Sequence, residues 1–234
     1  MHFTLIDPEK QAPAEAGRLA KFAESCGSDA IMVGGSTASG KATDDAVRAI
    51  KAASKLPVIL FPSTAEGVSV RADYLFFMML MNSTNRRFLV GEQVKAAPQL
   101  AKAGVKPIPM GYIVVSTSRK PTAVEKVGEV DAIREGDVEK AVAYALTAQY
   151  YGMSCVYLEA GSGAEKPVPD AMVSAVKKAL DIPLIVGGGI RDANTAEAKI
   201  RAGADVVVTG TIAEDDKSKL AEIIKAVTKP ECVS

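Results

Sequence analysis

Two glycine-rich segments late in the chain have the composition of an anion-binding site. The first is Gly187-Gly188-Gly189, and the second is Thr209-Gly210-Thr211. Glycine lets the backbone approach an anion closely, and the N–H groups at the start of a following helix point toward that anion. Either segment alone could be an ordinary turn between a strand and a helix. Together, and in this order, they favour a phosphate site.

The segment Tyr157–Gly163 contains the residues best suited to proton transfer. Tyr157 and Glu159 are two positions apart, so their side chains point to the same side of a strand. If that side faces a barrel interior, a phenol and a carboxylate lie together near its mouth. Gly161-Ser162-Gly163 adds backbone and hydroxyl donors beside them. The alternative is a serine that caps a helix and a glutamate that is paired with a lysine.

The chain has one histidine, His2, and we expect it at a fraying end of the chain. Ser–His, Cys–His and His-ligated metal chemistry are therefore nearly excluded. Ser162 also lies outside any GxSxG motif. An enzyme of this sequence would use a carboxylate, a tyrosine, a lysine or water as its proton acceptor, and Glu159 is the best placed of these.

Asp7 and Ser36 could supply oxygen ligands to Mg²⁺. Each follows a short apolar run near the start of the chain, in Ile6-Asp7-Pro8 and Gly35-Ser36. Mg²⁺ keeps several of its waters and completes its shell with one or two carboxylates and substrate phosphates. An aspartate before proline is also a common way to begin a turn, so this alternative stays open.

Short apolar runs that alternate with longer helical stretches must position these residues. Eight such runs on a repeat of roughly 20–35 residues, with right-handed crossovers, predict a single (β/α)8 TIM barrel over residues 1–234. A doubly wound open sheet is the alternative, but its phosphate loop usually follows the first strand. We expect strands at 3–7, 30–33, 57–61, 74–80, 108–115, 155–159, 183–186 and 205–208, and helices near 12–24, 43–53, 92–103, 138–151, 169–179, 194–202 and 218–227.

The alternation has one gap, between the third and fourth strands. Residues 62–73 are too few and too rich in Ser and Gly for a full crossover helix. We therefore predict that crossover helix 3 is replaced by an irregular segment. That replacement would open the barrel wall and leave a groove for an elongated ligand. A short 3₁₀ turn without functional consequence is the alternative.

The charge balance, the apolar stretches and the cysteines limit the kinds of partner and the compartment that the sequence predicts. Lys plus Arg and Asp plus Glu number 28 each, so no bulk charge favours nucleic acid and any anion site must be local. The longest apolar stretch, Tyr74–Met81, is far shorter than the ~20 residues of a membrane span, and we expect neither a leader nor stable membrane insertion. The three cysteines, Cys26, Cys155 and Cys232, lie far apart, so we expect reduced thiols in a cytoplasmic protein.

Taken together, these segments resemble the geranylgeranylglyceryl phosphate synthases and their bacterial heptaprenylglyceryl phosphate relatives. The resemblance covers essentially the whole chain and is most specific in YLEAGSG, VGGGI and TGT. The matching segments are Leu5–Lys10, Met32–Ser36, Asn82-Ser83, Pro109–Val114, Tyr157–Gly163, Gly187–Gly189 and Gly210-Thr211.

The resemblance implies a Mg²⁺-dependent prenyl transfer from a prenyl diphosphate, geranylgeranyl diphosphate above all, to the 3-hydroxyl of sn-glycerol 1-phosphate. It implies that Asp7 and Ser36 hold the metal and that Glu159 orients or deprotonates the hydroxyl, with Tyr157 beside it. The glycerol phosphate would contact Tyr157, Leu158, Glu159, Ala160, Gly161, Ser162, Gly163, Gly188, Gly189, Gly210 and Thr211. Members of this family also have an irregular segment in place of helix 3.

The prenyl tail needs an apolar groove, which Tyr112, Ile113, Val114 and the opening at residues 62–73 could line. The family pattern often has a helix before the first strand, whereas this sequence begins almost at the strand. The barrel floor would then be closed by side chains or by a neighbouring subunit, and we expect a homo-oligomer. Two alternatives share the phosphate loops: a barrel isomerase or lyase of amino-acid or cofactor biosynthesis, and a non-catalytic phosphate-binding barrel.

Overall fold

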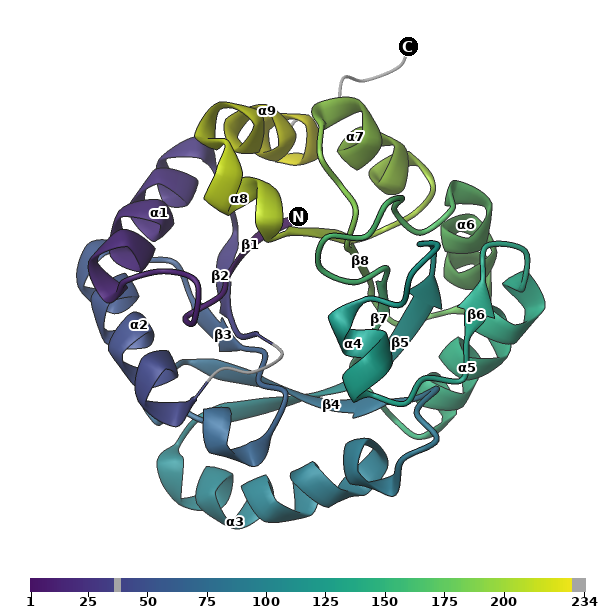
Figure 1. The fold of residues 1–234 in the computed structure, drawn as a ribbon, viewed down its shortest axis with the longest axis horizontal. Coiled ribbons are helices and arrows are strands. Elements are labelled where there is room, and N and C mark those ends of the chain that lie inside the picture. Colours follow the sequence, from purple (N-terminus) through teal and green to yellow (C-terminus); the bar gives the residue numbers. More distant parts are fainter. Residues whose placement is uncertain (36–38, 229–234) are drawn as a thin grey trace.

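Eight parallel strands form a closed barrel with helices around it, as Figure 1 shows. This computed structural model describes residues 1–35 and 39–228. The strands follow one another around the ring in chain order, and the pairing of β4 with β5 closes it. The TIM barrel predicted from the sequence is confirmed. Its strands are β1 (His2–Ile6), β2 (Ala30–Val33), β3 (Val58–Leu60), β4 (Tyr74–Leu80), β5 (Lys106–Ser116), β7 (Cys155–Glu159), β8 (Leu184–Gly187) and β9 (Val206–Thr209).

The outer helices begin and end close to the expected residues. α1 illustrates why: Pro13 occupies its first turn, and Gly27 ends it with a φ of 97°, a left-handed conformation that glycine adopts without strain. The outer helices are α1 (Pro13–Cys26), α2 (Gly40–Ala53), α3 (Glu92–Ala103), α5 (Val138–Tyr150), α6 (Asp170–Ala179), α7 (Ala193–Arg201) and α9 (Lys217–Thr228).

Four short elements were absent from the sequence-based prediction. A π-helix, η2 (Arg87–Gly91), leads into α3, and α8 (Thr211–Asp215) follows β9 directly. Between β5 and α5 lie α4 (Ala123–Val127) and the two-residue strand β6 (Ile133–Arg134), which pairs with the end of β5. Elements this short carry too little periodicity to be recognised from sequence.

The segment between β3 and β4 contains no α-helix. It contains only η1, a three-residue 3₁₀ turn at Ala65–Gly67, so the predicted replacement of crossover helix 3 is confirmed. The neighbouring helix α3 lies beside η1, and Glu92 at its start accepts a hydrogen bond from the Ala65 N–H.

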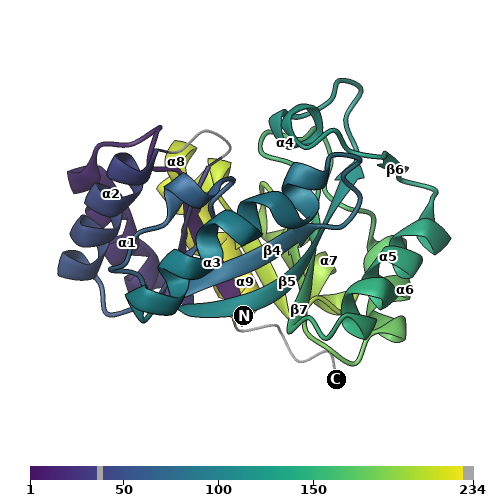
Figure 2. The same cartoon turned by 90° about the horizontal axis from the view of Figure 1, so that it is seen from below.

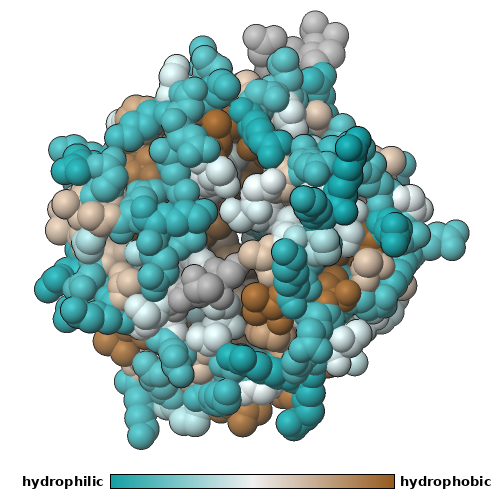
Figure 3. Space-filling model, viewed as in Figure 1, coloured by the Kyte–Doolittle hydropathy of each residue, from teal (hydrophilic) through white to brown (hydrophobic). Residues whose placement is uncertain are grey.

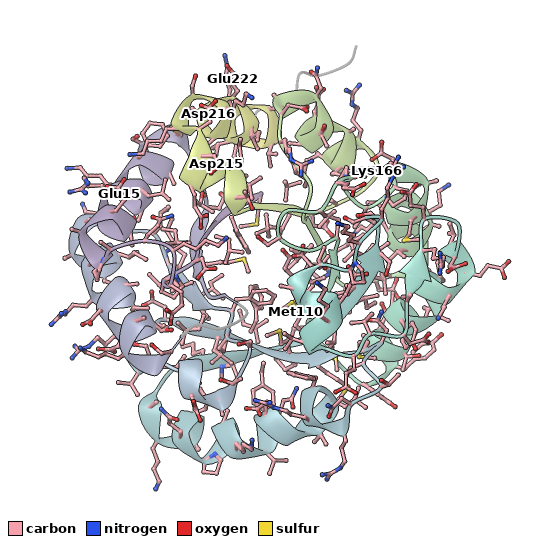
Figure 4. The ribbon with its side chains drawn as sticks, viewed as in Figure 1. Glu15, Met110, Lys166, Asp215, Asp216 and Glu222 are labelled. Atoms are coloured by element: carbon pink, nitrogen blue, oxygen red, sulfur yellow. The ribbon has the colours of Figure 1, made fainter. Side chains whose placement is uncertain are left out.

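The strands alternate between two hydrophobic layers. Inward-facing side chains such as Phe3, Met32, Phe76 and Met110 fill the barrel, and Figure 4 shows Met110 within the ring of strands. Outward-facing side chains pack against the helices. The filling includes Phe3, Ala30, Cys155 and Val206, each at the start of its strand. The packed interior therefore extends to the ends of the strands at which the chain enters the barrel.

The expectation that His2 lies at a fraying chain end is wrong. His2 is fully buried in β1, where its Nδ1 lies 3.1 Å from Ser28 Oγ and its Nε2 2.9 Å from Thr209 Oγ1. Burial, with help from the charged N-terminus, lowers the pKa of His2 to about 3. The neighbouring inward-facing residue is Phe3, so the imidazole points away from the interior. His2 is a structural residue outside the barrel mouth.

The two ends of the barrel differ. Figure 2 shows α4 and α8 at one end and the N-terminus toward the other. The end with α4 and α8 is where the strands finish, and therefore where the loops predicted to carry the chemistry lie. In residues 1–35 and 39–228, no helix is long and apolar enough to cross a bilayer. Cys26 and Cys155 are free thiols, and Cys232 lies outside the described residues.

Candidate active site

A cavity of about 1190 Å³ occupies the mouth of the barrel. Residues from both ends of the chain line it, as expected where the carboxyl ends of parallel strands meet. Figure 4 labels Asp215 on α8 at the edge of this mouth. The predicted site residues that line the cavity are Asp7, Tyr157, Glu159, Ser162, Gly163, Gly188, Gly189, Gly210 and Thr211. The structure thus brings residues that lie more than two hundred positions apart into one site.

Glu159 is the buried acid of this site. It is the last residue of β7, only 6% exposed, and its Oε1 accepts a hydrogen bond of 2.6 Å from the backbone N–H of Gly161. Burial raises the pKa of Glu159, while the Gly161 N–H and the nearby Tyr157 hydroxyl act in the opposite direction. A carboxylate with a raised pKa is better matched to accepting a proton near neutral pH.

Tyr157 lies inside the barrel in a group of four aromatic rings. It stacks on Phe61 with 5.6 Å between ring centroids and meets Tyr112 edge-on at 5.4 Å. Burial and the neighbouring Glu159 raise the pKa of Tyr157 well above its usual range. Its hydroxyl is buried and makes no hydrogen bond of ordinary geometry with the described residues, and Tyr157 lies in the wall of the cavity. The phenol therefore lies beside Glu159 as a buried polar group.

The late glycines allow close backbone approach on the other side of Glu159. Gly188 has a φ of 80°, and a Cβ there would overlap Glu159 Oε1. Gly189 has a φ of 70° and packs on the backbone of Lys166 and Pro167. Gly210 lies directly before α8, and Ser162 Oγ lies 3.3 Å from Thr211 Oγ1. Two glycine-containing loops and the hydroxyls of Ser162 and Thr211 thus line the cavity together.

Two of the residues expected at the glycerol phosphate turn their side chains away. Leu158 and Ala160 are fully buried in the layer between the barrel and its helices, which follows from strand alternation. Gly161 packs on Thr122, at the start of α4. These three positions can meet a ligand only through their backbone atoms.

Another part of the cavity lining is acidic. Asp7 lies 3.8 Å from Lys10 Nζ, which in turn lies 3.5 Å from Glu214 Oε2 on α8. Burial raises the pKa of Glu214, which Lys10 opposes and Asp7 reinforces. Ser36 lies outside the described residues. Among those residues no three metal-binding side chains converge, but Mg²⁺ at a diphosphate needs only one or two carboxylates, and Asp7 fits that role.

An apolar groove of about 720 Å³ adjoins the cavity. Four residues line both hollows: Ser63, Met78, Tyr112 and Val124. Figure 3 shows apolar side chains, in brown, gathered beside α4 in the end-on view. The predicted opening at residues 62–73 does line the groove, through Pro62, Ser63, Thr64, Ala65 and Val68. Tyr112 lines it too.

Ile113 and Val114 do not line the groove, contrary to expectation. Ile113 packs outward against the layer under α5, and Val114 points into the barrel. The two walls of the groove are joined by Glu92, whose carboxylate accepts from the Ala65 N–H at 2.9 Å and pairs with Arg87 at 2.7 Å and Lys95 at 3.0 Å. Burial raises the pKa of Glu92, but these partners outweigh it and lower the pKa to about 2.

Several residues of the site were missed by sequence reasoning. Lys10, Glu214 and Asp215 line the acidic side, and Arg191 lines the glycine side. Lys10 and Arg191 each follow within three residues of a residue that was predicted to lie in the site. This proximity in the sequence is the signal that could have identified them. Glu214 and Asp215 were missed because the helix that carries them, α8, was not predicted from the sequence.

The fold and the site together define a (β/α)8 barrel whose glycine-lined cavity holds a buried carboxylate and adjoins an apolar groove. A PcrB family model matches residues 1–229, and the chain belongs to this family. The geranylgeranylglyceryl phosphate synthase of Thermococcus kodakarensis is 49% identical over 232 residues, covering 99% of this chain and 89% of that protein. That of Pyrococcus horikoshii is 51% identical over 93% of this chain and 85% of that protein.

A solved structure extends the likeness to three dimensions. The (S)-3-O-geranylgeranylglyceryl phosphate synthase of Thermoplasma acidophilum, in complex with sn-glycerol-1-phosphate, superposes with a TM-score of 0.92 at 45% identity, covering 97% of this chain and 92% of that one. A thiamine phosphate pyrophosphorylase from Pyrococcus furiosus reaches a TM-score of 0.61 at 15% identity, covering 97% and 95%, which shows a shared fold alone.

Proposed function

We propose that this protein is a prenyltransferase that joins the 3-hydroxyl of sn-glycerol 1-phosphate to geranylgeranyl diphosphate through an ether bond. One observation carries the proposal: the polar cavity and the apolar groove share Ser63, Met78, Tyr112 and Val124 in their walls. A substrate with a charged head and a long apolar tail can therefore lie across both. The relatives named above support the choice of substrates.

The two substrates have complementary places. The glycine loops, with Ser162, Gly163 and Thr211, would bind the phosphate of glycerol phosphate through backbone and hydroxyl donors. The diphosphate would lie at the acidic side near Asp7, and the tail would enter the groove. This arrangement leaves the buried Glu159 between the two heads, where the hydroxyl must meet the allylic carbon.

The reaction then needs few groups. The bond between C1 of the prenyl chain and the diphosphate oxygen breaks, and the electron pair leaves with diphosphate. The hydroxyl oxygen of glycerol phosphate forms a bond to C1, and its proton passes to Glu159. Because the carbon left behind is allylic and cation-like, the protein chiefly positions the alcohol, and Tyr157 is the second residue proposed to orient it beside Glu159. Tyr112 and Phe61 pack against each other and against Tyr157, and the carboxylate of Glu159 is itself buried, which limits its contact with water.

A divalent cation fits the acidic side. Asp7 would hold Mg²⁺ together with diphosphate oxygens, and Ser36 stays a predicted second ligand. Bound there, Mg²⁺ would act as a Lewis acid that stabilises the charge of the leaving diphosphate. Lys10 lies between Asp7 and Glu214 and would balance the remaining negative charge.

The direct test is product analysis. The protein is incubated with Mg²⁺, sn-glycerol 1-phosphate and allylic diphosphates of different lengths, and the ether is identified by mass spectrometry. Omission of Mg²⁺ or its replacement by a chelator should abolish the product. No ether with any donor would overturn the proposal. We further propose one catalytic domain over residues 1–234 that acts in the cytoplasm as a homo-oligomer, which light scattering on the purified protein would test.

The alternative, a barrel isomerase or lyase, shares the glycine loops but has no use for an apolar groove continuous with the site. Such enzymes also need an acid–base pair or a reactive lysine at the strand ends. Within the described cavity lining, Lys10 is the lysine present, and it is paired with carboxylates. Turnover of a phosphorylated sugar or pyrimidine without a prenyl donor would favour this alternative.

A further inference from the structure

The cavity that is proposed to bind two anionic substrates is lined by more acidic than basic residues. Its acidic side chains are Asp7, Glu159, Glu214 and Asp215, whereas its basic side chains, among the described residues, are Lys10 and Arg191. Lys10 lies on the acidic side, within 3.8 Å of Asp7. The described lining at the glycine loops, where a phosphate group is expected, therefore contains a single cationic residue, Arg191.

Arg191 follows the glycines of the loop after β8 and reaches across to the loop after β7. Its Nη1 donates to the carbonyl of Glu165 at 3.0 Å, and its Nη2 donates to the carbonyl of Ala164 at 2.5 Å. The two carbonyls come directly after Gly163, which lines the cavity. One guanidinium thus connects the two glycine-rich loops on which the phosphate site is built.

The loop after β7 depends on such side-chain contacts because residues 160–169 form neither helix nor strand. Thr117 donates to the carbonyl of Lys166 at 2.6 Å, and the buried Lys199 donates to the carbonyl of Val168 at 2.6 Å. Figure 4 labels Lys166 on this loop. Of the side chains that hold these carbonyls, Arg191 is the one that also lines the cavity.

The partners of Arg191 leave its charge available. Both acceptors are neutral carbonyls, and within residues 1–35 and 39–228 Arg191 forms no ion pair. A guanidinium has five N–H donors, so others remain after these two bonds. An arginine paired with a carboxylate would offer a phosphate far less net attraction. Here the positive charge is held in place without being neutralised.

We propose that Arg191 is a positioning residue for the phosphate of sn-glycerol 1-phosphate: it fixes the loop Gly161–Pro169 against the glycines after β8 and supplies the positive charge of that side of the cavity. The proposal rests on the proposed function for the identity of the ligand. It explains how a site lined by more acidic than basic side chains accepts a second anion beside a diphosphate.

The test compares Arg191→Gln with Arg201→Gln. Arg201 lies on α7, is largely exposed and pairs with Glu197, so its replacement removes the same charge outside the cavity. Binding of inorganic phosphate and of sn-glycerol 1-phosphate is measured by calorimetry without a prenyl donor. Arg191→Gln should weaken both by about tenfold to a hundredfold, the usual range for hydrogen bonds to a charged group. Arg201→Gln should bind as the wild type does.

Arg191→Lys separates charge from geometry. A lysine keeps the charge but has no planar fork to hold two carbonyls, so its affinity should lie between those of the wild type and Arg191→Gln. In turnover, KM for glycerol phosphate should rise in both variants while KM for the prenyl diphosphate stays the same. Wild-type affinity in Arg191→Gln, or an equal loss in Arg201→Gln, would overturn the proposal. Because binding is measured without turnover, a lack of ether product would count against the proposed function and leave this result standing.

Discussion

Gly188 presses its backbone against the carboxylate of Glu159, so closely that a Cβ at position 188 would overlap Oε1. The strand register explains the contact, because Glu159 pairs with Gly187 across β7 and β8 and Gly188 is the next residue. The glycine loop therefore has two roles. It can offer N–H groups to a phosphate, and it also confines the buried carboxylate to one position.

The first prediction is that Gly188→Ala loses most activity while Gly152→Ala does not. Both glycines have positive φ, 80° and 77°, so both substitutions strain the backbone by roughly 1 kcal/mol. Only at Gly188 would the new methyl group meet Glu159, since nothing lies within 4 Å of a Cβ at Gly152. Steady-state kinetics and thermal unfolding of both variants test this. Equal activity in the two would show that Glu159 is not confined by the glycine.

The second prediction concerns Glu159→Gln. Glutamine keeps an acceptor for the Gly161 N–H but cannot take a proton, so turnover should fall by a factor of about 100 or more. The pKa of Glu159 is raised in the folded protein, so its stabilising contribution is full at low pH and is lost as pH rises through the folded pKa. The glutamine variant should therefore be more stable than the wild type at pH 8, with the difference shrinking toward pH 4.

Urea unfolding at the two pH values measures that difference. Substrate binding by calorimetry is the control, because the variant should still bind sn-glycerol 1-phosphate. Full retained turnover would remove Glu159 from its proposed role. A variant less stable than the wild type at pH 8 would mean that the buried charge is better compensated than its surroundings indicate.

Sequence reasoning located the main parts of this site because each was local. The glycine clusters, Glu159 and Asp7 all follow apolar runs, and in a parallel barrel the ends of such runs meet at one mouth. What it missed depends on contacts between distant segments. Nothing near Arg191 in the sequence reveals that it donates to carbonyls 26 and 27 positions earlier.

The error at His2 was of a different kind. Its place near the start of the sequence was taken to mean that its side chain lies at a frayed, exposed end. A second residue is usually frayed, but here β1 lies between β2 and β9 in the ring, so even its first residue is buried. The short helix α4 was missed for another reason: five residues show no clear periodicity, although Thr122 and Glu125 form a capping box that marks its start.

The third prediction is that His2 makes the protein acid-sensitive. Its pKa falls from 6.5 to about 3 on folding, so its contribution is full above pH 6.5 and is lost as pH falls toward 3, by about 1.4 kcal/mol per pH unit. His2→Gln, which keeps hydrogen-bonding groups for Ser28 and Thr209, should flatten that part of the pH dependence. Chemical denaturation between pH 7 and pH 4 measures it, and parallel curves for the two proteins would contradict the buried position of the imidazole.

The fourth prediction is that Glu92 joins the two walls of the groove. Its lowered pKa means that its contribution is present above the ordinary value of 4.5 and is lost as pH falls toward 2. Glu92→Gln should destabilise the protein by on the order of 1–3 kcal/mol at pH 7, since it weakens charged hydrogen bonds to Ala65, Arg87 and Lys95. Amide hydrogen exchange should rise at η1 and the start of α3. Unchanged exchange there would show that the groove walls do not depend on this residue.

The last prediction places the prenyl tail in the groove. Ala96 lines the groove and is 6% exposed, whereas its neighbour Ala97 is exposed on the outer side of α3. Ala96→Phe adds a ring where the tail would lie, so it should shift the preferred allylic diphosphate to a shorter chain. Ala97→Phe adds the same ring outside the groove and should leave the preference unchanged. The measurement is the ratio of kcat/KM for donors of two lengths, compared among the wild type and both variants.

Because the groove begins at Ser63, Met78, Tyr112 and Val124, a shorter chain would still reach the cavity and react. A long donor that Ala96→Phe still prefers as strongly as the wild type would mean that the tail leaves the cavity by another route.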